Sequence, residues 1–166
     1  MSGYNYMKMS EVNTASVTNL EVLLLSENAK APTRSYALDA GLDLYAAEDA
    51  FIAVNETKVI KTGIAVAVPE GYVGKIEDRS SMAAKGLRTG ADVVDSGYIG
   101  EVGVVIHNIN NSSVKDPVLW RNGYSIRKGD KIAQMLIYKV ERPTVTVVDS
   151  LSRSSRASNG FGSSGQ

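Results

Sequence analysis

The chain of 166 residues contains no cysteine and a single histidine, His107. Without thiols it cannot form a disulfide, use a thiolate nucleophile or hold zinc through cysteine. One imidazole cannot build a histidine-rich metal cluster.

Neither the charge nor the hydrophobicity of the chain points to a large partner. Its 18 basic and 18 acidic residues cancel, so we expect no binding to nucleic acid or to a membrane surface, although a small phosphate ligand needs only a few local cations. The longest apolar runs, such as residues 64–68, are too short to span a bilayer, and the N-terminus lacks the pattern of a secretion signal. We expect a soluble, intracellular protein, either cytoplasmic or nuclear, or inside the host cell if the source is viral.

Short β-branched runs divided by turn residues predict an all-β sandwich or barrel in a single domain. A brief helix over residues 81–85 is predicted, with Ser80 as its cap and Gly86 as its end. Residues 1–18 read as a flexible tail, 19–149 as the β domain, and 150–166 as an arm rich in glycine and serine. The predicted strands cover residues 20–26, 51–54, 57–62, 64–68, 72–76, 118–120, 124–127, 132–140 and 143–148.

Residues 91–108, ADVVDSGYIGEVGVVIHN, predict a β-hairpin. Two apolar arms flank the sequence DSGYIG, in which Asp95, Ser96 and two glycines supply turn chemistry. Such a turn holds Asp95 and Tyr98 at one rim of the sheet, where a fixed carboxylate beside an aromatic ring suits a small-ligand site and a general base. The plainer interpretation is an Asx-turn beside a packing tyrosine.

Three further segments carry polar residues at strand or helix ends. DAGLDL, residues 39–44, places two carboxylates around a glycine, which also fits a simple turn. DRSSM, residues 78–82, puts Arg79 and Ser80 beside the unpaired N–H groups of a helix start, which suits an anion or an ordinary serine cap. GDKIAQM, residues 129–135, contains Gln134, an uncharged amide donor that equally fits a polar strand position.

The last segment, RASNGFGSSG over residues 156–165, has the composition of a disordered tail. It also sets Arg156 at a fixed spacing from an isolated Phe161, among glycines whose backbone N–H groups can wrap a phosphate.

Taken together and in this order, the five segments resemble the five motifs of the trimeric dUTPase family. The resemblance implies a distorted jelly-roll, or β-clip, fold in a homotrimer, and hydrolysis of dUTP to dUMP and pyrophosphate. It also implies that Asp95 activates a water for in-line attack on the α-phosphorus. The resemblance further implies that Tyr98 packs under the sugar and excludes a 2′-hydroxyl. The substrate-binding residues implied are Arg79, Ser80, Ser81, Asp92, Tyr98, Gly103, Gln134, Arg156, Phe161 and Gly162.

The same resemblance implies a Mg²⁺ cofactor held mainly by triphosphate oxygens and waters. No side chain is expected to ligate it directly, and Asp43 is expected to reach it through water. Each active site is expected to combine three chains, with residues 91–108 from one, Arg79 and Gln134 from another, and the arm from the third.

The sequence departs from the family pattern at a few positions. Family members usually have Pro at position 78, where Asp78 adds a negative charge near the phosphates, and more often Gly at position 92. They more often have an acidic residue at 97 and glycine at 157 and 159.

Two other functions compete with dUTP hydrolysis. A related dCTP deaminase shares the Arg-Ser-Ser segment but needs a glutamate base at the position of Val105, and valine cannot carry a proton. A non-catalytic jelly-roll binding module is the alternative from another class.

Overall fold

The computed structural model describes residues 19–110 and 123–152. Its elements are short, as the spacing of turn residues predicts, and one helical turn lies among them. In chain order they are β1 (Glu21–Leu24), β2 (Leu42–Tyr45), β3 (Ala50–Ala53), β4 (Thr57–Ala67), β5 (Tyr72–Glu77), α1 (Ser80–Ala83), β6 (Leu87–Gly90), β7 (Val93–Asp95), β8 (Glu101–Asn108), β9 (Gly123–Ile126) and β10 (Lys131–Lys139).

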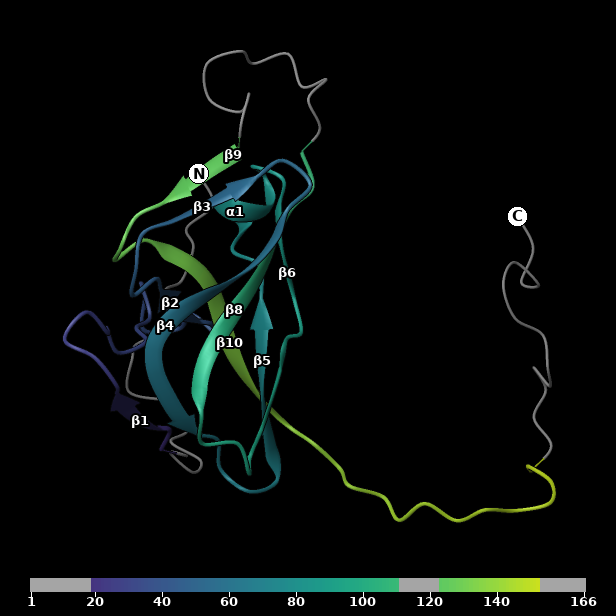
Figure 1. The fold of residues 1–166 in the computed structure, drawn as a ribbon. Helices are drawn as coiled ribbons and strands as arrows, with labels where there is room; N and C mark the ends of the chain where they lie inside the picture. Colours follow the sequence, from purple (N-terminus) through teal and green to yellow (C-terminus); the bar gives the residue numbers. More distant parts are fainter. Residues whose placement is uncertain (1–18, 111–122, 153–166) are drawn as a thin grey trace, which may run out of the picture.

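The strands form two antiparallel four-stranded sheets and a two-stranded ribbon (Figure 1). One sheet has the order β1-β4-β8-β6, the other β2-β10-β5-β7, and the ribbon pairs β3 with β9. Side chains on β8 are alternately half-buried and buried along its whole length, as expected for a strand with one face on the core. Apolar residues of both sheets join one buried cluster that includes Leu44, Ile60, Ile76, Val104 and Met135. The prediction of an all-β jelly roll is confirmed.

Residues 57–68, predicted as two strands separated by Gly63, belong mostly to the single long strand β4. Gly63 has a φ of +67°, and the pairing of β4 with β8 shifts register between Lys61 and Ala65. The glycine therefore lies at an irregularity inside one strand, where the left-handed conformation is available to it at little cost.

The predicted hairpin over residues 91–108 is wrong. Its two arms are both strands, but β7 pairs with β5 and β8 pairs with β4 and β6, so the arms lie in different sheets. The DSGYIG turn, closed by a bond from the Tyr98 N–H to the Asp95 carbonyl at 3.0 Å, joins the two sheets. Asp95 and Tyr98 still lie at a rim of the sandwich.

The helix begins one residue earlier than predicted, and Ser80 is not its cap. Arg79 occupies the N-cap position in an extended conformation, and no side chain caps the helix. Gly86, with a φ of +72°, ends the turn that follows. The helix α1 has a single turn. Among the described residues, no helix is long and apolar enough to cross a membrane.

The strand predicted at residues 143–148 does not form in the single chain. After β10 the backbone leaves the body of the molecule (Figure 1), and Val145 and Val147 are 90% and 95% exposed. A strand needs a neighbour to satisfy its N–H and C=O groups, and no described strand pairs with this stretch. The predicted tail 1–18, the strand 118–120 and residues 153–166 of the arm lie outside the described residues.

Candidate active site

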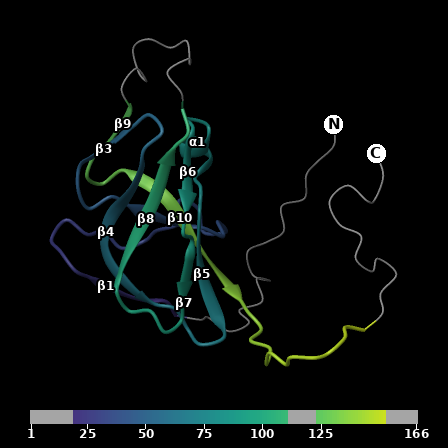
Figure 2. The ribbon, with the colours of Figure 1, turned by 45° about the vertical axis from the view of Figure 1, so that its right-hand side comes forward.

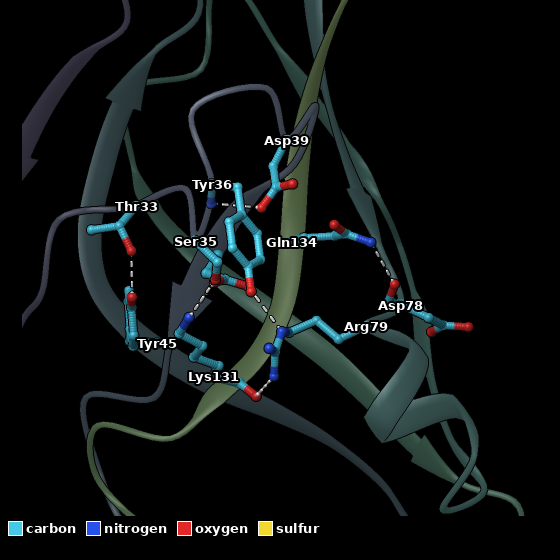
Figure 3. A network of polar contacts seen from close by, with 10 residues as sticks. Thr33, Ser35, Tyr36, Asp39, Tyr45, Asp78, Arg79, Lys131 and Gln134 are labelled. Carbon is cyan, nitrogen blue, oxygen red and sulfur yellow. Dashed lines mark hydrogen bonds and ion pairs between the residues drawn. The ribbon is translucent and has the colours of Figure 1, made fainter. Parts of the chain in front are cut away.

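Three of the predicted segments meet beside β10. Antiparallel pairing places Gln134 opposite Asp43 of β2 on one side and opposite Glu77 of β5 on the other. Since β5 ends there, the next residues lead directly into α1. The register thus gathers a group of side chains that we call the anion corner (Figure 3), made of Asp43, Arg79, Lys131 and Gln134.

Asp43 holds the cations of the anion corner in place. Its carboxylate is almost fully buried; Oδ1 accepts from Arg79 Nε at 2.8 Å, and Oδ2 accepts from Lys131 Nζ at 2.6 Å and from Ser35 Oγ at 3.2 Å. Burial alone raises the pKa of a carboxyl, but the Lys131 hydrogen bond and the Arg79 charge outweigh it and hold the pKa of Asp43 below its ordinary value. One carboxylate therefore orients two cations at once.

Gln134 is positioned from two sides. Its Nε2 donates to the backbone carbonyl of Asp78 at 2.9 Å. On the other side, a Cβ at Gly41 would lie 2.2 Å from Gln134 Oε1, so the glycine of DAGLDL makes room for the amide. Arg79 is fixed further by a bond from Nη1 to the Lys131 carbonyl at 3.2 Å.

The anion corner opens onto a hollow of about 440 Å³. Arg79, Ser80 and Gln134 line it, together with Asp39 and Asp43. The hollow therefore presents a guanidinium, a hydroxyl and an amide, donors that suit phosphate oxygens. Ser81, also predicted to bind substrate, lines a neighbouring hollow with Met82 and Lys85 instead.

The second group of predicted residues lines a smaller hollow of about 220 Å³, which we call the rim hollow. Asp95 is exposed at the end of β7. Tyr98 is 47% exposed, and its hydroxyl donates to the Glu101 carbonyl at 2.8 Å. Gly103 also lines the hollow and presents only backbone there, and an added Cβ would lie 2.7 Å from Val59.

Asp92 does not line the rim hollow, although its neighbour Ala91 does. The Asp92 carboxylate pairs with Lys75 of β5, a hydrogen bond that raises the pKa of the lysine ammonium. The Asp92 carbonyl accepts from the Ile76 N–H at 2.8 Å. Asp92 thus fastens the start of β7 to β5, a role that the sequence did not indicate.

Asp95 and the anion corner do not come together in one chain. Asp95 pairs with Val73 near the start of β5, whereas Gln134 pairs with Glu77 at its end. Four residues of extended strand separate these positions by about 13 Å, and Figure 2 shows β7 and α1 at opposite ends of the molecule. The two hollows share no lining residue.

Sequence reasoning missed Lys131 of the anion corner and Ser35, which forms hydrogen bonds with Asp43 and Lys131. Lys131 stands inside the quoted GDKIAQM segment, and a lysine at the start of a strand with buried neighbours was an available signal. Ser35 gave no sequence signal, because its contact with Asp43 depends on the β-bridge between Thr33 and Asp43. Arg156, Phe161 and Gly162 lie outside the described residues.

The side chains of the described residues indicate how the implied Mg²⁺ would be held. Within residues 19–110 and 123–152, no three acidic or histidine side chains gather into a metal-binding group, and both oxygens of Asp43 already accept bonds from Ser35, Arg79 or Lys131. These residues suit a hard cation that arrives with phosphate oxygens and waters rather than one held in a protein cage.

Replacing Asp43 by Asn should lower the free energy of unfolding at pH 7 by about 2 kcal/mol, between the values for exposed and buried ion pairs. Because the folded-state pKa of Asp43 is lowered, its stabilising effect is complete above the ordinary aspartate pKa and disappears as the pH falls through the folded value. Urea unfolding from pH 7 to pH 2.5 should show the difference from wild type shrinking below about pH 4. A difference that stays constant would contradict this.

The fold and the two hollows define an antiparallel jelly-roll protein with a cluster of cationic and amide side chains beside β10. A family model described as dUTPase matches residues 27–165. The deoxyuridine 5′-triphosphate nucleotidohydrolase of Kluyveromyces lactis is 42% identical over 156 residues, which cover 92% of this chain and 99% of that protein. The chain belongs to the dUTPase family, whose members are dUTP diphosphatases, and the resemblance read from the five motifs is confirmed.

Solved structures agree with this assignment. The dUTPase of Staphylococcus bacteriophage 80alpha, with dUPNHPP, superposes with a TM-score of 0.81 at 35% identity, covering 89% of this chain and 99% of that one. A mutant dUTPase from phage phi11 of S. aureus, described with a structural Mg(II) ion, has a TM-score of 0.73 at 34% identity and covers 82% of this chain and 100% of its own.

Proposed function

We propose that the protein hydrolyses dUTP to dUMP and pyrophosphate by in-line attack of a water on the α-phosphorus. The observation that carries the proposal is a family match over residues 27–165 in a chain that keeps Asp95 at the rim hollow and Arg79 with Gln134 at the anion corner. A bacteriophage relative has been solved with dUPNHPP, an analogue of dUTP, which supports the choice of substrate.

At the rim hollow, Asp95 orients the water and accepts its proton. Its exposure leaves the carboxylate accessible to solvent, and pairing of β7 with β5 fixes its backbone. Position matters first for a general base. Tyr98, fixed through its hydroxyl, packs under the deoxyribose and leaves no space for a 2′-hydroxyl. The bare backbone at Gly103 reads the uracil edge.

At the anion corner and the hollow beside it, Arg79, Ser80 and Gln134 bind the phosphate chain, and Ser81 binds it from the neighbouring hollow, which Arg79 also lines. A cation and aligned donors stabilise the charge that grows on the departing pyrophosphate. Asp43 acts indirectly, by holding Arg79 in place. The arm contributes Arg156 at the terminal phosphate, Phe161 over the base and Gly162 through its N–H, a prediction for residues outside the described ranges.

The active form is a homotrimer in which one site combines residues of three chains. Two features support this. The rim hollow and the anion corner lie about 13 Å apart at opposite ends of β5 in one chain and share no lining residue. The stretch after β10 leaves apolar residues exposed, Val145 and Val147 among them, as expected for a segment that packs against another chain.

Mg²⁺ is the proposed cofactor, and when bound it neutralises phosphate oxygens and orients the triphosphate. No described carboxylate cluster competes for it. The phi11 relative described with a structural Mg(II) ion supports the choice of metal.

Pyrophosphate release from dUTP, dCTP, dTTP and UTP, measured with and without Mg²⁺, tests the proposal. We expect turnover of dUTP at least about a hundredfold above the others in kcat/KM, because the rim hollow selects both base and sugar, and we expect it to require the metal. Ammonia release from dCTP would indicate a deaminase instead. Absence of turnover with all four nucleotides would favour a binding module.

A further inference from the structure

Asp78, the residue at which this chain departs from the family pattern, directs its carboxylate away from the anion corner. Oδ1 accepts from the Thr89 N–H at 2.6 Å and from Thr89 Oγ1 at 3.0 Å, and Oδ2 accepts from Arg88 Nε at 2.8 Å. The carboxylate is only 19% exposed. Figure 3 shows it pointing away from Arg79. Its negative charge is therefore matched by an arginine of β6 and does not oppose a phosphate.

The main chain of Asp78 serves the anion corner directly. Its carbonyl accepts the bond from Gln134 Nε2, and its peptide leads into Arg79. One residue therefore connects three elements: β6 through the side chain, β10 through the carbonyl, and α1 through the chain. Any shift of Asp78 moves Arg79 and Gln134 together.

The segment that follows has little support of its own. A single helical turn is unstable without tertiary contacts, and α1 has neither a side-chain cap nor an acidic residue in its first turn. Arg79 precedes it in an extended conformation. The bonds from Asp78 to β6 help to fix where β5 ends and α1 begins, beside the bonds of Arg79 to Asp43 and Lys131 and the buried Met82.

We propose that Asp78 is a positioning residue for phosphate binding, which uses its bonds to Arg88 and Thr89 to hold Arg79 and Gln134 at the anion corner. The proposal rests on the proposed function of that corner. The Asp78 side chain points away from the anion corner and acts through Arg79 and Gln134. Its removal therefore weakens binding of the phosphate chain and leaves the rim hollow intact.

The test compares two ligands on Asp78→Ala. We expect the affinity for dUPNHPP to fall about tenfold, the effect of losing a charge-assisted hydrogen bond, while deoxyuridine, which has no phosphate, binds as in wild type by chemical-shift titration. With dUTP as substrate, KM should rise more than kcat falls. Asp78→Asn keeps an acceptor for Thr89 but loses the charge facing Arg88. Its affinity for dUPNHPP should therefore lie between those of the wild type and Asp78→Ala.

Asp49→Asn is the matched control, because Asp49 also accepts from a backbone N–H, that of Lys128 at 2.7 Å, away from both hollows. It should change neither ligand's affinity. If both Asp78 variants lost affinity for dUPNHPP and for deoxyuridine equally, Asp78 would stabilise the fold in general, and the inference would be overturned. Unchanged dUPNHPP affinity would overturn it too, while dUTP turnover by the wild type would leave the proposed function standing.

Discussion

Asp95→Asn should reduce kcat for dUTP by about a thousandfold, within the range that a positioned general base contributes. The amide keeps the size of the side chain but cannot accept a proton from the attacking water. Because Asp95 is exposed at the end of β7 and contributes no side chain to the buried core, the fold should be unaffected. The dissociation constant for dUPNHPP should change by less than about threefold, since a general base acts on the transition state rather than on ground-state binding.

Single-turnover kinetics and calorimetry with dUPNHPP separate these effects. Glu48→Gln, which makes the same chemical change on an exposed loop between β2 and β3, serves as the control and should match wild type in both measurements. Normal turnover by Asp95→Asn would show that another group activates the water. A loss of dUPNHPP binding equal to the loss of kcat would make Asp95 a binding residue instead.

Because alternation of side chains is a local property, periodicity predicted most of the strands of this protein, but not β2 or β6. Residues 101–108 alternate as expected and form β8. Alternation does not name the partner of a strand, however. DSGYIG has the chemistry of a hairpin turn, yet it connects two sheets, because the pairing of β7 with β5 depends on residues about twenty positions earlier.

The remaining errors share this origin. Residues 143–148 have strand-forming composition but no neighbour among the described strands. Without a partner for its backbone groups, this stretch does not form a strand. Asp78 carried a charge that the sequence placed beside the phosphates, whereas its partner Arg88 follows ten residues later on β6. The residues of the anion corner were found largely through family motifs, since their meeting depends on the register of β2, β5 and β10.

Mixing two inactive variants should restore activity, because in the proposed trimer the rim hollow and the anion corner that serve one nucleotide belong to different chains. Asp95→Asn chains lack the base but keep Arg79; Arg79→Gln chains lack the phosphate-binding cation but keep the base. After dissociation and reassociation at equal amounts, roughly a quarter of the sites should combine an intact Asp95 with an intact Arg79 from a neighbour, given a closed symmetric ring and random assembly. Pyrophosphate release per site should recover to about that fraction of wild type.

The double variant, mixed with wild type, distinguishes shared sites from self-contained ones. With sites shared between chains, both residues of a site come from different subunits and again roughly a quarter remain active, whereas self-contained sites would leave roughly half. Native mass spectrometry must show mixed assemblies of three chains in both experiments. Mixed trimers that stay as inactive as each parent would place Asp95 and Arg79 in one chain's site, which the pairing of β5 with β7 and β10 opposes.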